Sequence, residues 1–222
     1  MAHALAEAGG DGEGVQATIC ARDFEIHVDL LVEPGAETRA DELVHAISGP
    51  LERYLFAEDE RPVEEIVLAM CRSRGLTLAT AESCTGGLVA ARLTSVPGAS
   101  EVFRGGVVAY ADDVKQSELD VPGPVLREHG AVSPETAEAM AAGARARLGA
   151  DVGVAVTGIA GPGGGTPDKP VGLVYIHAET PDGARGIEFD FPADREFIRQ
   201  RAAVAALHLV RRLLAQSADE SV

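Results

Sequence analysis

Residues 76–96 decide the fold, and they read LTLATAESCTGGLVAARLTSV. The first six residues are mostly apolar and form a short run, which is typical of a buried strand. Residues 88–96 have the composition of a helix, and Pro97 and Gly98 provide its stop signal. A buried strand that turns directly into a helix is the repeating unit of α/β proteins, so this stretch predicts that class.

The alternation of strands and helices continues along the chain. The predicted strands are 76–81, 102–110, 152–156, 171–178 and 186–191, and the predicted helices are 62–74, 88–96, 115–119, 134–148 and 194–214. Ser133, Pro134 and Glu135 give the fourth helix a strong start, with a Ser cap, Pro in the first turn and an early acid. The last two strands follow one another across a short turn and are expected to be antiparallel. The pattern predicts a three-layer α/β/α fold with a mixed sheet.

The N-terminal quarter has a different organisation. Residues 1–14 are small, acidic and Gly-rich, and we expect a disordered tail there. Residues 15–33 alternate apolar and polar side chains like a strand, and Thr38 could cap a helix that extends to Leu55. We therefore predict a small α+β module at 15–60, a main domain at 61–216 and a short tail at 217–222.

Composition restricts the classes of function. The 222 residues include 35 acidic and 19 basic side chains, a net charge of −16. This balance argues against a nucleic-acid surface and against binding to anionic membranes. The sequence shows no apolar run of about 20 residues and no secretory leader, so we expect a cytoplasmic protein. The three cysteines lack metal-ligand spacing and the histidines are scattered, so we expect no metal and no cofactor.

The segment Glu82–Gly87, ESCTGG, is the first candidate for chemistry. A sharp strand-to-helix turn exposes a side chain next to free backbone N–H groups, which can stabilise an oxyanion. Ser83 is the candidate nucleophile, with Cys84 and Thr85 as alternatives. The competing interpretation is structural, because Ser or Thr before a helix is commonly an N-cap.

Tyr110 and Lys115 form the second candidate. Lys115 and Lys169 are the only lysines among 19 basic residues. Lysine can act as a general base and arginine cannot, so a Ser–Lys pair with an orienting Tyr is a plausible nucleophile system. An ordinary surface lysine is the alternative. A dehydrogenase Tyr–Lys pair is disfavoured, because the spacing is five rather than four and no dinucleotide fingerprint precedes it.

The Gly-rich loop at 158–170, GIAGPGGGTPDKP, is the third candidate. Glycines allow a backbone to approach a phosphate closely. The loop matches neither the G-x-G-x-x-G nor the Walker A spacing. It is therefore either part of a binding pocket or a long flexible connection.

Taken together, AESCTGG, the Tyr110–Lys115 segment and TGIAGPGGG resemble the CinA C-terminal domain family over about residues 64–214. The resemblance implies nicotinamide-nucleotide amidohydrolase activity, in which nicotinamide mononucleotide is converted to nicotinate mononucleotide and ammonia. It implies that Ser83 is the nucleophile and that Lys115 and Tyr110 are its catalytic partners, with Lys115 returning the proton through Tyr110 to the departing ammonia. Backbone N–H groups near Thr85 to Gly87 would then hold the oxyanion. The implied substrate-binding residues are Thr85, Gly86, Gly87, Arg104, Thr157, Gly158, Ile159, Ala160 and Gly161, with Arg104 as the candidate arginine for the ribose phosphate.

The resemblance also implies a homodimer that binds a small nucleotide and needs no cofactor. Residues 15–60 resemble the KH-like module that precedes this domain in longer family members. RNA binding is not expected, because the module is acidic and no G-x-x-G separates its elements. Nothing in the sequence corresponds to the family's molybdopterin-binding-like domain, so its pyrophosphatase activity is not expected. Two alternatives remain: a non-catalytic competence- or DNA-damage-associated partner protein, and an amidase for another small nucleotide amide.

Overall fold

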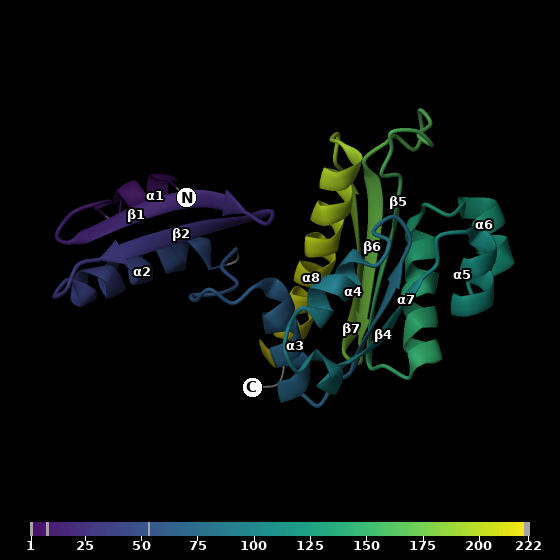
Figure 1. Ribbon diagram of the computed structural model, residues 1–222, viewed down its shortest axis with the longest axis horizontal. Helices are drawn as coiled ribbons and strands as arrows, with labels where there is room; N and C mark the ends of the chain where they lie inside the picture. The colour runs from purple at the N-terminus through teal and green to yellow at the C-terminus, as the bar shows by residue number, and fades with distance from the viewer. Residues whose placement is uncertain (1, 8, 53, 220–222) are drawn as a thin grey trace. The chain divides into compact units, whose positions relative to one another are not determined.

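The computed structural model describes residues 2–7, 9–52 and 54–219 (Figure 1). The chain divides into two compact units, Met1–Glu60 and Arg61–Val222. The larger unit contains the three candidate sites and is described first.

A five-stranded sheet with the order β4-β3-β5-β6-β7 forms the centre of the larger unit. Its strands are β3 (Leu78–Glu82), β4 (Phe103–Val108), β5 (Val152–Gly158), β6 (Leu173–Thr180) and β7 (Gly183–Asp190). Strand β3 pairs in parallel with β4 and β5, whereas β6 pairs antiparallel with β5 and β7. The predicted mixed sheet is confirmed.

Helices cover both faces of this sheet (Figure 1). Helix α7 (Pro134–Leu148) lies on one face and contacts α5 (Asp112–Leu119) and α6 (Gly123–His129). Helix α8 (Arg195–Asp219) lies on the other face with α3 (Val63–Ser73) and α4 (Leu88–Thr94). A short 3₁₀ turn, η1 (Ala99–Glu101), precedes β4. The three-layer α/β/α prediction is confirmed.

Local signals explain most of these elements. Every residue of β3 is buried, as expected for a central strand covered on both faces. Helix α7 begins as predicted: the Ser133 hydroxyl accepts a hydrogen bond from the Thr136 N–H, and the helix ends at Gly149 with φ +61°. Helix α6 was not predicted, because it has no buried residue and therefore no apolar periodicity.

The smaller unit is a hairpin covered by one helix. Strands β1 (Val15–Arg22) and β2 (Glu25–Val32) pair antiparallel, and α2 (Glu37–Leu51) packs against them through Leu43 and Ile47. The sequence predicts one strand over 15–33, and this differs from the structure. The turn at Asp23 and Phe24 has φ +51° and +66°, a conformation that Gly or Asn usually signals.

The structure also differs from the predicted tails. Helix α1 (Ala2–Glu7) lies within residues 1–14, and Leu5 packs against the core of the smaller unit. Helix α8 extends to Asp219, so only 220–222 of the predicted C-terminal tail lie outside the described residues. The similarity of the smaller unit to a KH module stays a prediction.

Candidate active site

The turn after β3 presents Ser83 at the carboxyl edge of the sheet. Gly86 and Gly87 have φ +62° and +100°, so glycines are needed for this turn to enter α4. The buried Glu82 carboxylate accepts hydrogen bonds from the N–H groups of Gly87 (2.9 Å), Val89 (3.1 Å) and Ala90 (2.9 Å). Helix α4 therefore begins at Leu88 with Gly87 as its N-cap, and the N-cap interpretation of Ser83 and Thr85 is wrong.

A pocket of about 200 Å³ opens beside Ser83. It is lined by Ser83, Cys84, Tyr110, Asp112, Lys115, Ala131, Val132, Gly158, Ala160 and Arg195. Most of these residues lie at or after the ends of β3, β4 and β5, whereas Ala131 and Val132 lie between α6 and α7 and Arg195 begins α8. Because the carboxyl ends of parallel strands meet at one edge, segments far apart in sequence contribute to a single pocket.

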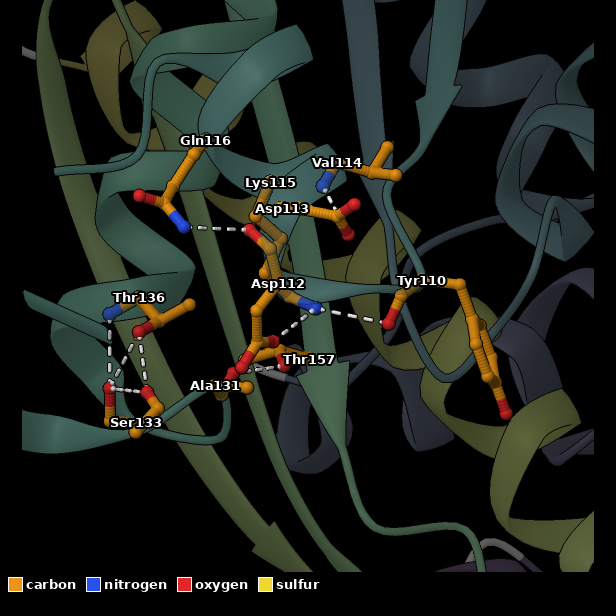
Figure 2. Close-up of polar contacts among 11 residues, drawn as sticks. Tyr110, Asp112, Asp113, Val114, Lys115, Gln116, Ala131, Ser133, Thr136 and Thr157 are labelled. Carbon is orange, nitrogen blue, oxygen red and sulfur yellow. Dashed lines mark hydrogen bonds and ion pairs between the residues drawn. The ribbon is translucent and has the colours of Figure 1, made fainter. Parts of the chain in front are cut away.

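Lys115 is buried in the wall of this pocket, with an exposed fraction of 1%. Its Nζ donates hydrogen bonds to the Tyr110 main-chain carbonyl (3.2 Å) and to the Asp112 carboxylate (3.4 Å), as Figure 2 shows. A lysine ammonium is rarely this buried without partners. The surface-lysine interpretation is therefore wrong, and the structure brings Lys115 and Ser83 to the same pocket.

The Tyr110 side chain does not contact Lys115. Its ring points away from the amine (Figure 2), and its hydroxyl accepts a hydrogen bond from Arg195 Nη2 at 2.9 Å. The expected proton relay from Lys115 through the Tyr110 hydroxyl is thus not supported by the geometry. Tyr110 instead binds Lys115 through its main-chain carbonyl and is one of the residues that line the pocket.

Arg195 is the functional candidate that sequence reasoning missed. Its Nη1 donates to the Gly161 carbonyl at 2.7 Å, so the guanidinium links Tyr110 to the Gly-rich loop. A weak signal was available, because Arg195 is the first residue of α8, where a cation opposes the helix dipole. Arg104, the residue expected to bind phosphate, lies on β4, donates to the Leu148 carbonyl at 3.4 Å and does not line this pocket.

The Gly-rich loop contributes in two ways. Gly158 and Ala160 line the pocket directly, whereas Gly161 contributes its carbonyl to Arg195. Thr157 is fully buried and its hydroxyl donates to the Ala131 carbonyl at 2.6 Å, so it supports the pocket wall. The Ile159 N–H donates to the Leu173 carbonyl, and Ile159 is not among the lining residues.

The other predicted binding residues belong to the turn after β3 and do not line the pocket. Thr85 is fully buried, the Gly86 N–H donates to the Ser83 carbonyl at 3.1 Å, and the Gly87 N–H donates to Glu82. None of these three lines the pocket. Thr85, Gly86 and Gly87 therefore shape the turn, and direct substrate contact by them is not supported.

Lys169 connects the Gly-rich loop to the segment that follows α6. Its Nζ donates to the carbonyls of His129 (2.6 Å) and Val132 (2.7 Å), and Val132 lines the pocket. A compact ammonium can donate in several directions at once, which a planar guanidinium does less well. The interpretation of the loop as a free connection is therefore wrong, and both lysines of the chain bind backbone carbonyls around one pocket.

Cys84 is a poor alternative to Ser83. Burial raises the pKa of its thiol from 9 to about 12, and the nearby Glu82 carboxylate acts in the same direction. The thiolate is the nucleophilic form of cysteine, and little of it exists near neutral pH at such a pKa. Ser83 is consequently the stronger candidate nucleophile in the turn.

Within residues 2–7, 9–52 and 54–219, no three His, Cys, Asp or Glu side chains gather in a way that could hold a metal ion. In the same ranges, no helix combines the length and the apolar character that crossing a bilayer requires.

Similar proteins were identified from sequence. Residues 60–214 match the CinA C-terminal domain model. A CinA-like protein of Citrifermentans bemidjiense is 43% identical over 92% of this chain and 49% of its own length. A CinA-like protein of Mycolicibacterium gilvum is 44% identical over 96% of this chain and 51% of its own. A putative competence-damage inducible protein of Caldicellulosiruptor bescii is 42% identical over 86% of this chain and 48% of its own. The chain thus spans about half the length of these relatives.

Solved structures agree with this assignment. The competence/damage inducible protein CihA from Agrobacterium tumefaciens is 40% identical, with a TM-score of 0.66 over 71% of this chain and 99% of that one. Competence damage-inducible protein A (ComA) from Klebsiella pneumoniae is 34% identical, with a TM-score of 0.65 over 70% of this chain and 98% of that one. On these matches, the chain belongs to the CinA C-terminal domain family.

Proposed function

We propose that this chain is an amidohydrolase that converts nicotinamide mononucleotide to nicotinate mononucleotide and ammonia. One observation carries the proposal: Ser83 and the buried Lys115 line the same small pocket although 32 residues separate them along the chain. A hydroxyl next to an amine that can carry a proton is a known nucleophile–base arrangement. The substrate itself is taken from the resemblance to nicotinamide-nucleotide amidohydrolases.

The proposed reaction has two steps. In the first, the Ser83 hydroxyl attacks the carboxamide carbon while Lys115, in its unprotonated form, accepts the hydroxyl proton. The proton then passes to the leaving nitrogen, the C–N bond breaks, and ammonia departs from an acyl-Ser83 ester. In the second step, water attacks the ester carbon while Lys115 takes its proton. The C–O bond to Ser83 then breaks, and Lys115 returns the proton to the Ser83 oxygen as the nicotinate product leaves.

The N–H groups of Gly86 and Gly87 are not available to stabilise the oxyanion, so other donors are needed. The Gly86 and Gly87 N–H groups already donate to Ser83 and Glu82. We assign the Cys84 N–H to the oxyanion, because the amide of the residue after a nucleophile commonly has this role in strand-turn-helix sites. No metal or organic cofactor takes part in this scheme.

Arg195 replaces Arg104 as the proposed phosphate-binding residue. Its guanidinium lines the pocket, so a permanently positive group lies there within a chain of net charge −16. Guanidinium binds phosphate oxygens in a bidentate fashion. The small side chains of Ala131 and Ala160 leave room for a flat ring between Ser83 and Arg195.

The test is direct. Purified protein is incubated with nicotinamide mononucleotide, and ammonia and nicotinate mononucleotide are measured. We expect both products in equal amounts, and none with Ser83→Ala. Ser117→Ala, which changes an exposed serine outside the pocket, is the matched control. Turnover of other nucleotide amides alone would indicate a different amidase, and absence of any turnover would favour a non-catalytic partner role.

A further inference from the structure

Arg199 of α8 binds the turn that presents Ser83. Its Nε donates to the Cys84 carbonyl at 3.2 Å, and its Nη2 donates to the Thr85 carbonyl at 3.0 Å. Its Nη1 donates to the Glu196 carboxylate at 3.0 Å on the same helix. All three guanidinium nitrogens are therefore engaged, and two of them bind successive carbonyls directly after Ser83.

The turn is shaped to receive this guanidinium. Gly86 has φ +62°, and a Cβ atom at that position would lie 3.5 Å from Arg199 Nη2. On the other side of the turn, the Glu82 carboxylate accepts three N–H groups. An anion thus binds the donors of the turn and a cation binds its acceptors, which leaves the backbone little freedom to rotate.

We propose that Arg199 is a positioning residue for Ser83. Arg199 does not line the pocket, so it acts through the two carbonyls that it orients. Its bonds hold the turn so that the Ser83 hydroxyl faces the pocket that contains Lys115. The catalytic part of this inference rests on the proposed function, whereas the structural part concerns the turn alone.

The geometry requires arginine rather than lysine at this position. Nε and Nη2 project from one rigid plane and reach two carbonyls at once. A lysine side chain has one ammonium nitrogen on a flexible chain, so it lacks the two coplanar donor nitrogens that bind both carbonyls. The side chain is also a quarter exposed, so an external guanidinium ion can reach the same position when the side chain is removed.

The experiment uses two readouts on the full chain. The first is the rate at which N-ethylmaleimide alkylates Cys84, measured by mass spectrometry of its peptide. Cys84 is only 5% exposed in this turn, so a turn that opens is expected to react faster. The second is steady-state turnover of nicotinamide mononucleotide. The variants are Arg199→Gln, Arg199→Lys and Arg199→Ala, and Arg201→Gln is the matched control because its side chain stacks on Phe191 instead.

In Arg199→Gln we expect the rate of Cys84 alkylation to rise about 10-fold. We also expect kcat to fall about 10- to 100-fold while KM changes less than about 3-fold, because a misplaced nucleophile mainly affects the chemical step. Arg199→Lys is expected to lie between wild type and Arg199→Gln. Millimolar guanidinium is expected to restore part of the activity of Arg199→Ala and to slow its Cys84 alkylation. Arg201→Gln is expected to match wild type in both readouts.

The outcomes separate this inference from the proposed function. An unchanged Cys84 alkylation rate in Arg199→Gln overturns the positioning role, whatever happens to turnover. Faster alkylation with unchanged kcat also overturns it, since the turn would then open without affecting Ser83. If wild type does not turn over the nucleotide, the proposed function fails, and the alkylation rates alone decide whether Arg199 holds the turn. Should Arg199→Gln not fold, Arg199→Lys and guanidinium rescue provide the same comparison.

Discussion

Lys115 binds Tyr110 through the backbone rather than through the phenol. The Lys115 amine donates to the Tyr110 main-chain carbonyl at 3.2 Å (Figure 2), while the Tyr110 hydroxyl accepts from Arg195. Tyr110 lies in the connection between β4 and α5, and Lys115 follows five residues later within α5, so the local path of the chain brings the carbonyl to the amine. This relationship separates the roles of the two side chains.

Tyr110→Phe and Lys115→Arg are therefore expected to differ sharply. The phenylalanine variant keeps the carbonyl that binds Lys115, so kcat should stay within about 3-fold of wild type. Lys115→Arg keeps the charge but removes the proton acceptor, and kcat should fall at least about 100-fold, within the range typical of losing a general base. Initial rates with nicotinamide mononucleotide measure both. A larger loss of kcat in Tyr110→Phe than in Lys115→Arg would indicate that the Tyr110 hydroxyl takes part in proton transfer.

Arg195→Gln is expected to weaken binding of the phosphate. KM for nicotinamide mononucleotide should rise at least about 10-fold, because a charge-assisted bidentate contact is lost. KM for the corresponding riboside, which lacks phosphate, should change little. Arg104→Gln is the control, since Arg104 does not line the pocket. Equal effects of Arg195→Gln on nucleotide and riboside would show that Arg195 binds something other than phosphate.

Glu82→Gln is expected to destabilise the domain. The carboxylate accepts three backbone N–H groups in a buried position, and an amide has only one acceptor oxygen. Leaving buried donors without partners should lower the free energy of unfolding by about 1–3 kcal/mol. Urea denaturation measures this difference. Glu101→Gln, which removes a surface ion pair with Arg72, should cost no more than about 1 kcal/mol, and an equal loss in both variants would contradict the assigned role of Glu82.

Cys84 is expected to be dispensable for catalysis. With a pKa of about 12, roughly one thiol in 10⁴ is ionised at pH 8, so Cys84→Ala should keep kcat within about 3-fold of wild type. If Cys84→Ala were inactive while Ser83→Ala remained active, the nucleophile would be the Cys84 thiol instead of the Ser83 hydroxyl.

The raised pKa of the Cys84 thiol also predicts that the free energy of unfolding depends on pH. The unfolded thiol ionises above about pH 9 and the folded one only near 12, so the folded state binds more protons in between. The free energy of unfolding should therefore fall as pH rises above 9, and Cys84→Ala should reduce that slope. Urea denaturation at pH 8 and at pH 10 measures this change in the free energy of unfolding. The same change in wild type and in Cys84→Ala would contradict burial of the thiol.

The sequence by itself determined the elements and most of their order. Strand β3, helix α7 and the turn at Gly86 and Gly87 are encoded by short-range signals: apolar runs, a Ser–Pro start and glycines that accept positive φ. These signals depend on a few adjacent residues, so they can be read without a fold. They also located Ser83 and Lys115, although their meeting in one pocket depended on the family resemblance.

Only the tertiary structure decided which side chains share the pocket and which way they point. Arg195 reaches Tyr110 across 85 positions, and Lys169 reaches Val132 across 37. The Tyr110 ring turns toward α8, and Thr85 turns into the core, although both seemed equally suited to the site. Hydrogen bonds between distant segments depend on how the strands pair and how α8 packs on the sheet. That information belongs to the whole chain and is present in no single motif.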